Sequence, residues 1–282
     1  MKTFLITGVS SGLGRAFAEA ALEAGHTVVG TVRRQAELES FEALAPTAHG
    51  RLLDVTDEEA VFGTVNDVES TVGPIDVVIA NAGYGLEGVF EETPLSELRA
   101  QFDTNVFGVA ATLQAALPYL RQRRSGHLMA VTSMGGMMAP AGLTAYCGSK
   151  FALEGLLESL GKEVAQFGVH VTAIEPGSFR TDWAGRSMRR SERTIADYDD
   201  LFAPIRDARV QASGNQLGDP AKAAAAVLRI AESDNPPRHL VLGSDALRLI
   251  RTARHAVDEE IDRWESVSRT TDFPDGHQIA AG

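Results

Sequence analysis

Three side chains near the middle of the chain have the types and spacing needed to act together on a carbonyl group. Tyr146 and Lys150 are four residues apart, and Ser133 precedes the tyrosine by thirteen. In a helix that begins near Thr144 or Ala145, a spacing of four places two side chains on one face, one turn apart. An ammonium beside a phenol lowers the phenol pKa from about 10 toward the range useful for proton transfer. The spacing predicts Tyr146 as an acid or base; a surface tyrosine and lysine are the alternative.

Ser133 also occupies a favourable place relative to the expected sheet. It follows residues 127–132, H-L-M-A-V-T, an apolar run typical of a buried strand. Its hydroxyl should therefore lie at the carboxyl end of that strand, the edge at which open parallel sheets bind ligands.

Short apolar segments alternate with helical patterns along most of the chain. This alternation predicts an α/β fold, a doubly wound parallel sheet covered by helices on both faces in three layers. The expected strands are residues 3–6, 27–32, 50–53, 75–80, 127–131, 169–174 and 239–242. The expected helices are residues 13–23, 36–44, 58–72, 95–120, 145–166 and 220–231. We predict one domain over residues 1–244, followed over 245–282 by a helix at 247–264 and a frayed tail at 272–282.

Residues 178–218 interrupt this alternation with a long insertion that contains no clear strand. Four arginines lie close together in it, at positions 186, 189, 190 and 193, and the sequence assigns them no role. Insertions of this length are usually lids or binding segments. We predict a mobile lid; a solvated surface excursion is the alternative.

Composition excludes several classes of function. The chain has 282 residues, a formal net charge of -12 and a pI near 5.1, which argue against nucleic acid or an anionic membrane as the main partner. Cys147 is the only cysteine, and the N-terminus lacks a signal-peptide pattern, so we expect a cytoplasmic protein. Seven histidines show no ligand-like spacing and predict no metal site. Two interpretations of Cys147 are open: a small residue within a helix, which we favour, or a redox switch beside Tyr146.

The first strand is followed by residues 7–14, T-G-V-S-S-G-L-G, which open a helix. Glycines at 8, 12 and 14 allow a tight turn and close approach of the backbone to a pyrophosphate at the helix N-terminus. An ordinary glycine turn is one alternative. A hydrolase nucleophile at Ser10, within the G-x-S-x-G of residues 8–12, is another, but that motif needs a partnering acid and histidine.

Taken together, these motifs resemble those of the short-chain dehydrogenase/reductase family, from about residue 2 to 243. The family's T-G-x-x-x-G-x-G matches residues 7–14, its N-A-G residues 81–83, and its P-G-x-x-x-T residues 176–181. Its catalytic serine, tyrosine and lysine match Ser133, Tyr146 and Lys150. Asn105 matches the asparagine of the family's proton relay. Ala80 departs from many members, which carry a second asparagine there.

The resemblance implies a Rossmann fold and hydride transfer between a nicotinamide cofactor and a carbonyl or alcohol. Tyr146 would donate the proton, Ser133 would stabilise the substrate oxygen, and Lys150 would lower the tyrosine pKa and hold the ribose. Asn105 would support a water, or else simply close a helix kink. The cofactor-binding residues implied are Gly8, Ser10, Ser11, Gly12, Leu13, Gly14, Arg33, Arg34, Asp54, Val55, Asn81, Ala82, Gly83, Tyr146, Lys150, Pro176, Gly177, Phe179 and Thr181.

The second expected strand ends without an acidic residue before Glu37, and Arg33 stands where similar NADP-dependent members carry a basic residue. We therefore expect NADP(H) to be preferred over NAD(H), two solvated arginines being the alternative. The expected partner is a small carbonyl or alcohol, bound among the apolar residues Met134, Met137, Met138, Phe179 and Trp183.

Related proteins are commonly homo-oligomers, although residues 245–282 have room to cover an association surface. A cofactor-sensing protein without turnover is the alternative function, but it has no need of serine, tyrosine and lysine together.

Overall fold

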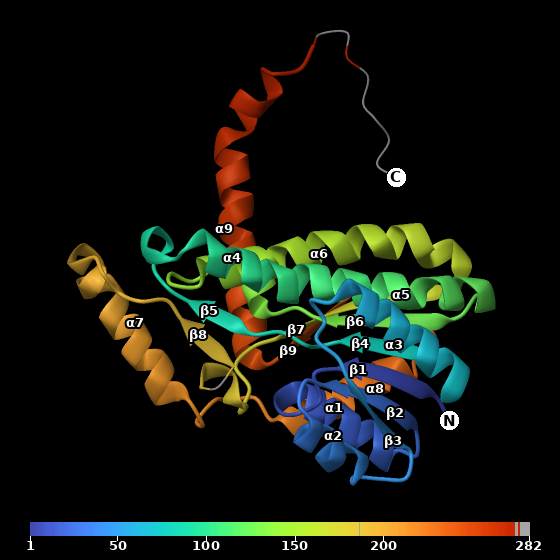
Figure 1. Cartoon of the computed structure of the whole chain (residues 1–282). Helices are drawn as coiled ribbons and strands as arrows, with labels where there is room; N and C mark the ends of the chain where they lie inside the picture. Colours follow the sequence, from blue (N-terminus) through green and yellow to red (C-terminus); the bar gives the residue numbers. More distant parts are fainter. Residues whose placement is uncertain (186, 274–275, 277–282) are drawn as a thin grey trace.

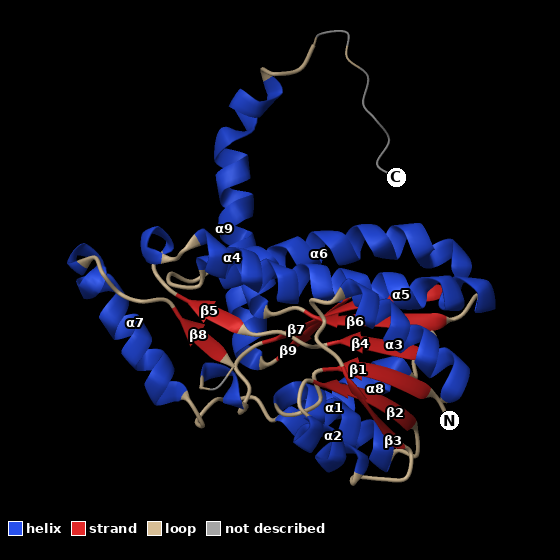
Figure 2. Cartoon of the chain, in the orientation of Figure 1, coloured by secondary structure: helices blue, strands red, loops and turns tan. Residues whose placement is uncertain are grey.

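A seven-stranded parallel sheet forms the centre of the structure, a computed structural model that describes residues 1–185, 187–273 and 276 (Figure 1). The strand order is β3-β2-β1-β4-β6-β7-β9. Helices cover both faces, which confirms the predicted three-layer fold (Figure 2). The strands are β1 Thr3–Thr7, β2 Thr27–Val32, β3 Ala48–Leu52, β4 Val77–Ala80, β6 Gly126–Val131, β7 Val169–Pro176 and β9 His239–Leu242.

Two separate apolar cores lie on the two faces of this sheet, because successive side chains of a strand point in opposite directions. In β1, Phe4 and Ile6 pack into one core and Leu5 into the other. The first core is completed by helices α1 Gly12–Glu23, α2 Gln35–Glu42 and α8 Pro220–Ala231. The second is completed by α3 Glu58–Thr71, α5 Gly108–Arg123 and α6 Thr144–Val164. The strands are apolar on both faces because both faces are covered.

The helix expected over residues 95–120 is interrupted. It consists of α4 Leu95–Phe102, a wide π-helical turn η2 Asp103–Phe107, and α5. Such π turns insert an extra residue into a helix and are frequent at functional sites. The interruption turns Asn105 into the protein interior, where it is fully buried.

The prediction that residues 178–218 contain no strand is wrong. Strand β8 Met188–Arg190 pairs in parallel with β5 Gly85–Glu87, forming a small second sheet beside the main one (Figure 2). Helix α7 Asp199–Ala212 follows. Short 3₁₀ turns occur at η1 Phe90–Glu92, η3 Met134–Gly136, η4 Ala165–Phe167, η5 Asp182–Ala184 and η6 Ala196–Tyr198.

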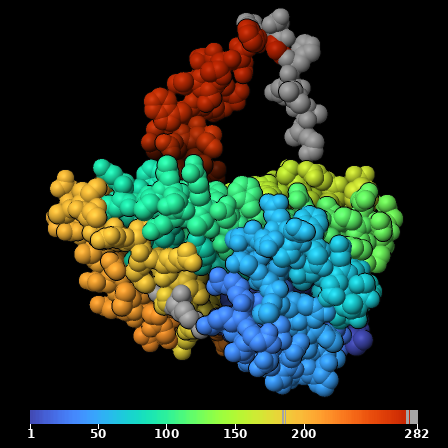
Figure 3. Space-filling model, viewed as in Figure 1, coloured from blue at the N-terminus to red at the C-terminus, as the bar shows by residue number. Residues whose placement is uncertain are grey.

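The last helix, α9 Ser244–Arg269, is longer than the predicted 247–264. Ala246 and Ile250 at its base are buried against the body, whereas its C-terminal half projects away from it (Figures 1 and 3). The tail predicted at 272–282 lies mostly outside the described residues. In the described part of the chain, no helix combines the length and the apolar character required to cross a membrane.

Candidate active site

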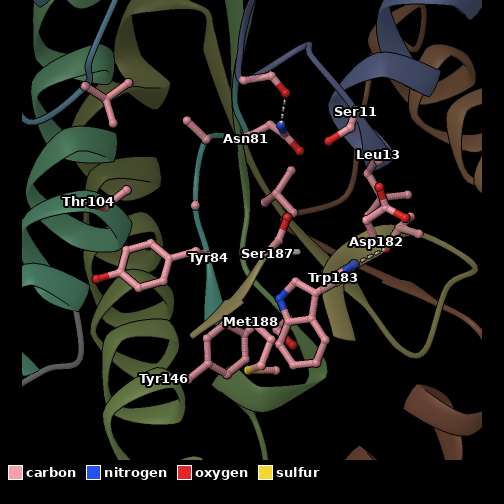
Figure 4. Close-up of a pocket in the computed structure, with 18 of the residues that line it drawn as sticks. Ser11, Leu13, Asn81, Tyr84, Thr104, Tyr146, Asp182, Trp183, Ser187 and Met188 are labelled. Carbon is pink, nitrogen blue, oxygen red and sulfur yellow. Dashed lines mark hydrogen bonds between the residues drawn. The ribbon is translucent and has the colours of Figure 1, made fainter. Parts of the chain in front are cut away.

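A cavity of about 1410 Å³ opens at the carboxyl end of the sheet (Figure 4). It gathers residues from the glycine loop, from the ends of β2, β3, β4, β6 and β7, from α6 and from the segment after β7. Of the predicted site residues, Gly14 and Asn105 are the two that do not line it. The cavity is lined by Gly8, Ser10, Ser11, Gly12, Leu13, Arg33, Arg34, Asp54, Val55, Asn81, Ala82, Gly83, Ser133, Tyr146, Lys150, Pro176, Gly177, Phe179 and Thr181, among others.

The glycine loop between β1 and α1 has the geometry of an anion site. Gly8 and Gly12 have φ values of +74° and +63°, which favour glycine. A Cβ at Gly14 would lie 2.4 Å from the Gly8 carbonyl oxygen, so a larger residue does not fit. Ser11, the N-cap of α1, makes no side-chain capping bond, and the first turn holds no acidic residue. The first amides of α1 therefore face the cavity without a capping side chain, an arrangement that fits a pyrophosphate.

Asn81 and Thr7 hold this loop against the end of β4. The Asn81 Nδ2 donates to the Thr7 carbonyl oxygen (2.9 Å) and to the Gly8 carbonyl oxygen (3.0 Å). The Thr7 hydroxyl oxygen accepts from the backbone N–H groups of Asn81 (2.9 Å) and Ala82 (3.0 Å). The structure therefore shows Asn81 fixing the shape of the glycine loop.

Charged groups at the ends of β2 and β3 form the distal end of the cavity. Arg33 is exposed and lines it, and its charge helps to lower the pKa of Asp54, after the larger effect of the Thr56 backbone hydrogen bond. Arg34 forms an ion pair with Glu37. Since Glu37 engages Arg34, Arg33 is the better placed of the two arginines to meet a further anion.

Tyr146, Lys150 and Ser133 meet at the opposite end. Helix α6 begins at Thr144, as predicted, and both Tyr146 and Lys150 are buried on it. The Lys150 Nζ donates to the Val131 carbonyl oxygen (2.8 Å) and lies 5.8 Å from the centre of the Tyr146 ring. The Ser133 hydroxyl oxygen accepts from the Gly135 N–H (2.9 Å), which leaves its own O–H free to act as a donor.

The predicted lowering of the Tyr146 pKa by Lys150 is not found. Burial raises the pKa of Tyr146 above its usual range, and the hydrogen bond with Ser133 offsets only part of this increase. Burial also lowers the pKa of Lys150 to about 8, while the negative charge of Glu154 raises it. Desolvation is therefore the largest influence on the pKa of both side chains.

Asn105 is occupied by a structural task. Its Oδ1 accepts from the Tyr84 N–H (3.1 Å), and its Nδ2 donates to the Tyr84 carbonyl oxygen (3.0 Å) and lies 3.3 Å from the Ser149 hydroxyl oxygen. The side chain thus fixes the backbone of Tyr84, whose ring lines the cavity. The predicted contact of Asn105 with a water stays a prediction.

Behind Lys150 lies a group that sequence analysis missed, here called the Glu154 cluster: Glu154, Glu175 and His239. The His239 Nδ1 lies 2.6 Å from a Glu175 carboxylate oxygen and 3.6 Å from a Glu154 carboxylate oxygen. Both Glu154 oxygens and one Glu175 oxygen are buried and have no hydrogen-bond partner among the described residues. Burial raises the pKa of Glu154 to about 7, and that of Glu175 also rises. The one sequence feature that could have indicated this cluster was the spacing of four residues from Lys150 to Glu154, which places both on one face of a helix.

Apolar side chains form the wall next to Tyr146. The Trp183 ring lies 5.2 Å from the Tyr146 ring, and Met188 packs beside both (Figure 4). Met134 and Phe179 line the cavity as expected, while Met137 and Met138 do not. Tyr84 and Met188 were missed, although Tyr84 directly follows the N-A-G motif.

The arginines predicted as a cluster bind mainly to the protein itself. Arg189 stacks over the Tyr84 ring (4.6 Å), and Arg190 lies 3.5 Å from the buried Glu87. Arg193 pairs with Glu92 and with Asp199, both at 2.7 Å. Arg186 lies outside the described residues. These contacts attach the segment after β7 to β5 and its neighbours.

Comparison with known proteins agrees with the fold and identifies the family. The family described as short chain dehydrogenase matches residues 2–192. Oxidoreductase BOA17 of Botryotinia fuckeliana is 37% identical over 95% of this chain and 98% of its own. The 3-ketodihydrosphingosine reductase of Bacteroides thetaiotaomicron is 35% identical over 85% of this chain and 87% of its own. A solved short-chain dehydrogenase from Streptomyces avermitilis is 43% identical, with a TM-score of 0.89, over 96% of this chain and 99% of its own.

Proposed function

Because the chain belongs to the short-chain dehydrogenase family, we propose that it transfers a hydride between NADP(H) and a ketone or secondary alcohol. The observation that carries this proposal is the convergence of Tyr146, Lys150 and Ser133 on the cavity that also receives the glycine loop. The alternative of a cofactor sensor draws no support from any feature of this site.

The nicotinamide cofactor supplies the hydride in reduction and accepts it in oxidation. Negative charge develops on the substrate oxygen during reduction, so donors around that oxygen stabilise the transition state. The Tyr146 phenol donates the proton, and its raised pKa keeps that proton in place at neutral pH. The Ser133 O–H donates a hydrogen bond to the same oxygen. Lys150 supplies positive charge beneath the phenol as the proton leaves.

The chain's backbone would hold the cofactor at one end and an arginine would hold it at the other. The first amides of α1 and the glycine loop would bind the pyrophosphate, and Asp54 and Val55, which line the same cavity, would contact the adenine. Arg33 would bind the 2′-phosphate of NADP(H). A homo-oligomer and a cytoplasmic location stay predictions.

The substrate is a ketone that carries an apolar chain. Trp183, Met188 and Met134 provide an apolar wall next to Tyr146, against which such a chain packs. The relative from Bacteroides thetaiotaomicron is named as a reductase of a ketone, 3-ketodihydrosphingosine. That name supports a ketone as the substrate class.

Replacing Tyr146 with phenylalanine tests the reaction. Turnover of NADPH with a panel of apolar ketones should fall by about 10² to 10⁴-fold, because the transferable proton is removed. The dissociation constant for NADPH should change little. The matched control is Tyr198→Phe, at a partly exposed tyrosine whose hydroxyl donates to Glu91. Turnover within about tenfold of wild type would remove Tyr146 from the proton-transfer role. NADPH binding without turnover of any ketone or alcohol would instead support the sensor.

Replacing Arg33 with alanine tests the choice of cofactor. One charge-assisted hydrogen bond contributes about 1.5–3 kcal/mol, so kcat/KM for NADPH should fall about 10- to 100-fold while that for NADH changes little. Arg34→Ala should have a smaller effect, because Glu37 already engages Arg34. A wild type that favours NADH, or equal losses with both cofactors, would show that Arg33 does not bind the phosphate.

A further inference from the structure

Three arginines surround a single buried carboxylate beside the apolar wall of the cavity. Glu87, the last residue of β5, is 1% exposed. One of its carboxylate oxygens lies 3.2 Å from a guanidinium nitrogen of Arg209, and the other lies 3.5 Å from Arg190 and 3.8 Å from Arg206. These four residues, here called the Glu87 cluster, come from β5, β8 and α7, which lie side by side in Figure 1. The cluster holds three positive charges against one negative charge.

Two of these arginines face the cavity itself. Arg190 and Arg209 line it together with Glu87, whereas Arg206 is not part of its wall. The side chains of Arg190 and Arg209 are 24% and 18% exposed, so solvent screens their charges only in part. The Arg209 guanidinium donates to Glu87 and to the Ala141 carbonyl oxygen (2.7 Å), which fixes its orientation. A guanidinium held in this way keeps further N–H donors in the same plane for another acceptor.

The other carboxylates of the cavity wall have other neighbours. Asp182 lies beside Leu13 of α1 (Figure 4). Asp103 acts at Tyr84: burial raises the pKa of that phenol, Arg189 lowers it and Asp103 raises it, so the two charges oppose each other there. The remaining carboxylates of the wall come from α2, α3 and the end of β3: Glu37, Asp54 and Glu58. The charge balance at the Glu87 cluster is therefore set by its own four residues.

The Glu87 cluster lies within reach of the reacting end of the cavity. Met188, two residues before Arg190 on β8, packs beside Tyr146. The charge of Arg209 acts on Cys147, the residue after Tyr146: burial raises the pKa of that thiol to about 11, and Arg209 offsets part of the rise. A ligand whose carbonyl group lies at Tyr146 can therefore extend along the apolar wall and end at the arginines.

We propose that Arg190 and Arg209 bind an anionic group, a carboxylate or a phosphate, at the far end of the substrate's apolar chain. The inference rests on the proposed hydride transfer, which places the carbonyl at Tyr146, and it narrows the substrate class to ketones or alcohols with an anionic end. Planar guanidinium groups match the paired oxygens of either anion. Glu87 is a positioning residue here, because its carboxylate holds the two guanidinium groups together against their mutual repulsion. The chain has a net charge of -12, so attraction of an anion is a property of this site and not of the whole molecule.

The first measurement compares ketones that differ in the charge at the far end. Straight-chain oxo acids, with the ketone next to the opposite end, are paired with their methyl esters, and phosphate monoesters of hydroxyketones are paired with the free hydroxyketones. Wild type should favour the anion of a pair by about 10- to 100-fold in kcat/KM, mainly through a lower KM. Salt should reduce this preference. The pair with the larger preference identifies the group as a carboxylate or a phosphate.

Substitutions at the Glu87 cluster locate the preference. Arg209→Met and Arg190→Met should each lower the ratio of the two kcat/KM values toward one, because each removes donors from the cavity wall. Arg206→Met is the matched control: it also removes an arginine from Glu87, but Arg206 does not line the cavity, so the ratio should stay at its wild-type value. Arg209→Lys keeps the charge and loses the planar fork, so it should give an intermediate ratio, and it replaces Arg209→Met if that variant does not fold.

Binding without turnover separates this inference from the proposed reaction. Fluorescence quenching of Trp183, which lies against Tyr146, measures the affinity of each acid and ester in a Trp264→Phe background with NADP+ present, which cannot reduce them. Esters reduced without any preference for the acids, or a preference that survives in Arg209→Met, would overturn the inference and leave the reaction standing. Acids that bind more tightly than esters through Arg209, with no ketone turned over, would overturn the reaction and support the anion site. Equal binding of acid and ester would overturn the inference in either case.

Discussion

Replacing Glu154 with glutamine should stabilise the protein above neutral pH and change little near pH 4.5. Glu154 is buried one turn beyond Lys150, and burial raises its pKa from 4.5 to about 7. Between these two values the folded protein retains a proton that the unfolded chain has lost. Stability therefore falls as pH rises through this window and is level above it. Glutamine cannot ionise and escapes this loss.

The pKa change sets the size of the effect. A rise in pKa of about 2.5, at 1.36 kcal/mol per pKa unit, corresponds to at most about 3–4 kcal/mol of unfolding free energy. Urea unfolding of wild type and Glu154→Gln in steps from about pH 5 to about pH 8 measures it. The matched control is Glu158→Gln, one turn further along α6, where the carboxylate is exposed and paired with Lys162. A difference that does not vary with pH, or a wild type that is the more stable at about pH 8, would refute the reasoning.

The same substitution should alter the pH dependence of the reaction. The Glu154 carboxylate raises the pKa of Lys150, which burial lowers to about 8. Without that carboxylate, Lys150 loses its proton at a lower pH. The alkaline limb of kcat/KM for ketone reduction should then move to lower pH in Glu154→Gln and stay in place in Glu158→Gln.

Two other parts of the site are open to test. Asn105→Ala removes the hydrogen bonds to the Tyr84 backbone, so the unfolding free energy should fall by about 1–3 kcal/mol. KM for the ketone should rise, because Tyr84 lines the cavity. An unchanged KM would show that the position of Tyr84 does not matter for substrate binding. Residues 178–218 are still predicted to act as a lid, so their amide hydrogen exchange should slow when NADPH and substrate bind, and equal exchange in the two states would contradict closure.

The sequence was sufficient to predict the local structure wherever that structure depends on residues close together in the chain. The T-G-x-x-x-G-x-G motif requires a strand, a turn with positive φ and a helix within a few residues, and β1, Gly8 and α1 follow in that order. The start of α6 at Thr144 likewise follows from the spacing of Tyr146 and Lys150. Local spacing fixes which side chains share a helix face.

Pairing between distant short segments was not predictable in this way. Strands β5 and β8 contain three residues each and lie about a hundred residues apart, so neither shows a periodic pattern. The Glu154 cluster comes from α6, β7 and β9, and histidine spacing gives no sign of it because two of its members are glutamates. Contacts of this kind depend on the order of the strands in the sheet.

The Tyr146 pKa shows why spacing predicts neighbours better than charges. The spacing of four residues did bring Lys150 beneath Tyr146, but the Lys150 Nζ donates to Val131 and both side chains are buried. Burial penalises the charged form of each, raising the pKa of the phenol and lowering that of the amine. The site therefore favours a protonated phenol, and negative charge that develops on a substrate oxygen meets donors held in place before the reaction begins. No local motif encodes burial, and burial makes Tyr146 a proton donor. Tyr146 would act as a base only where additional positive charge lowered its pKa.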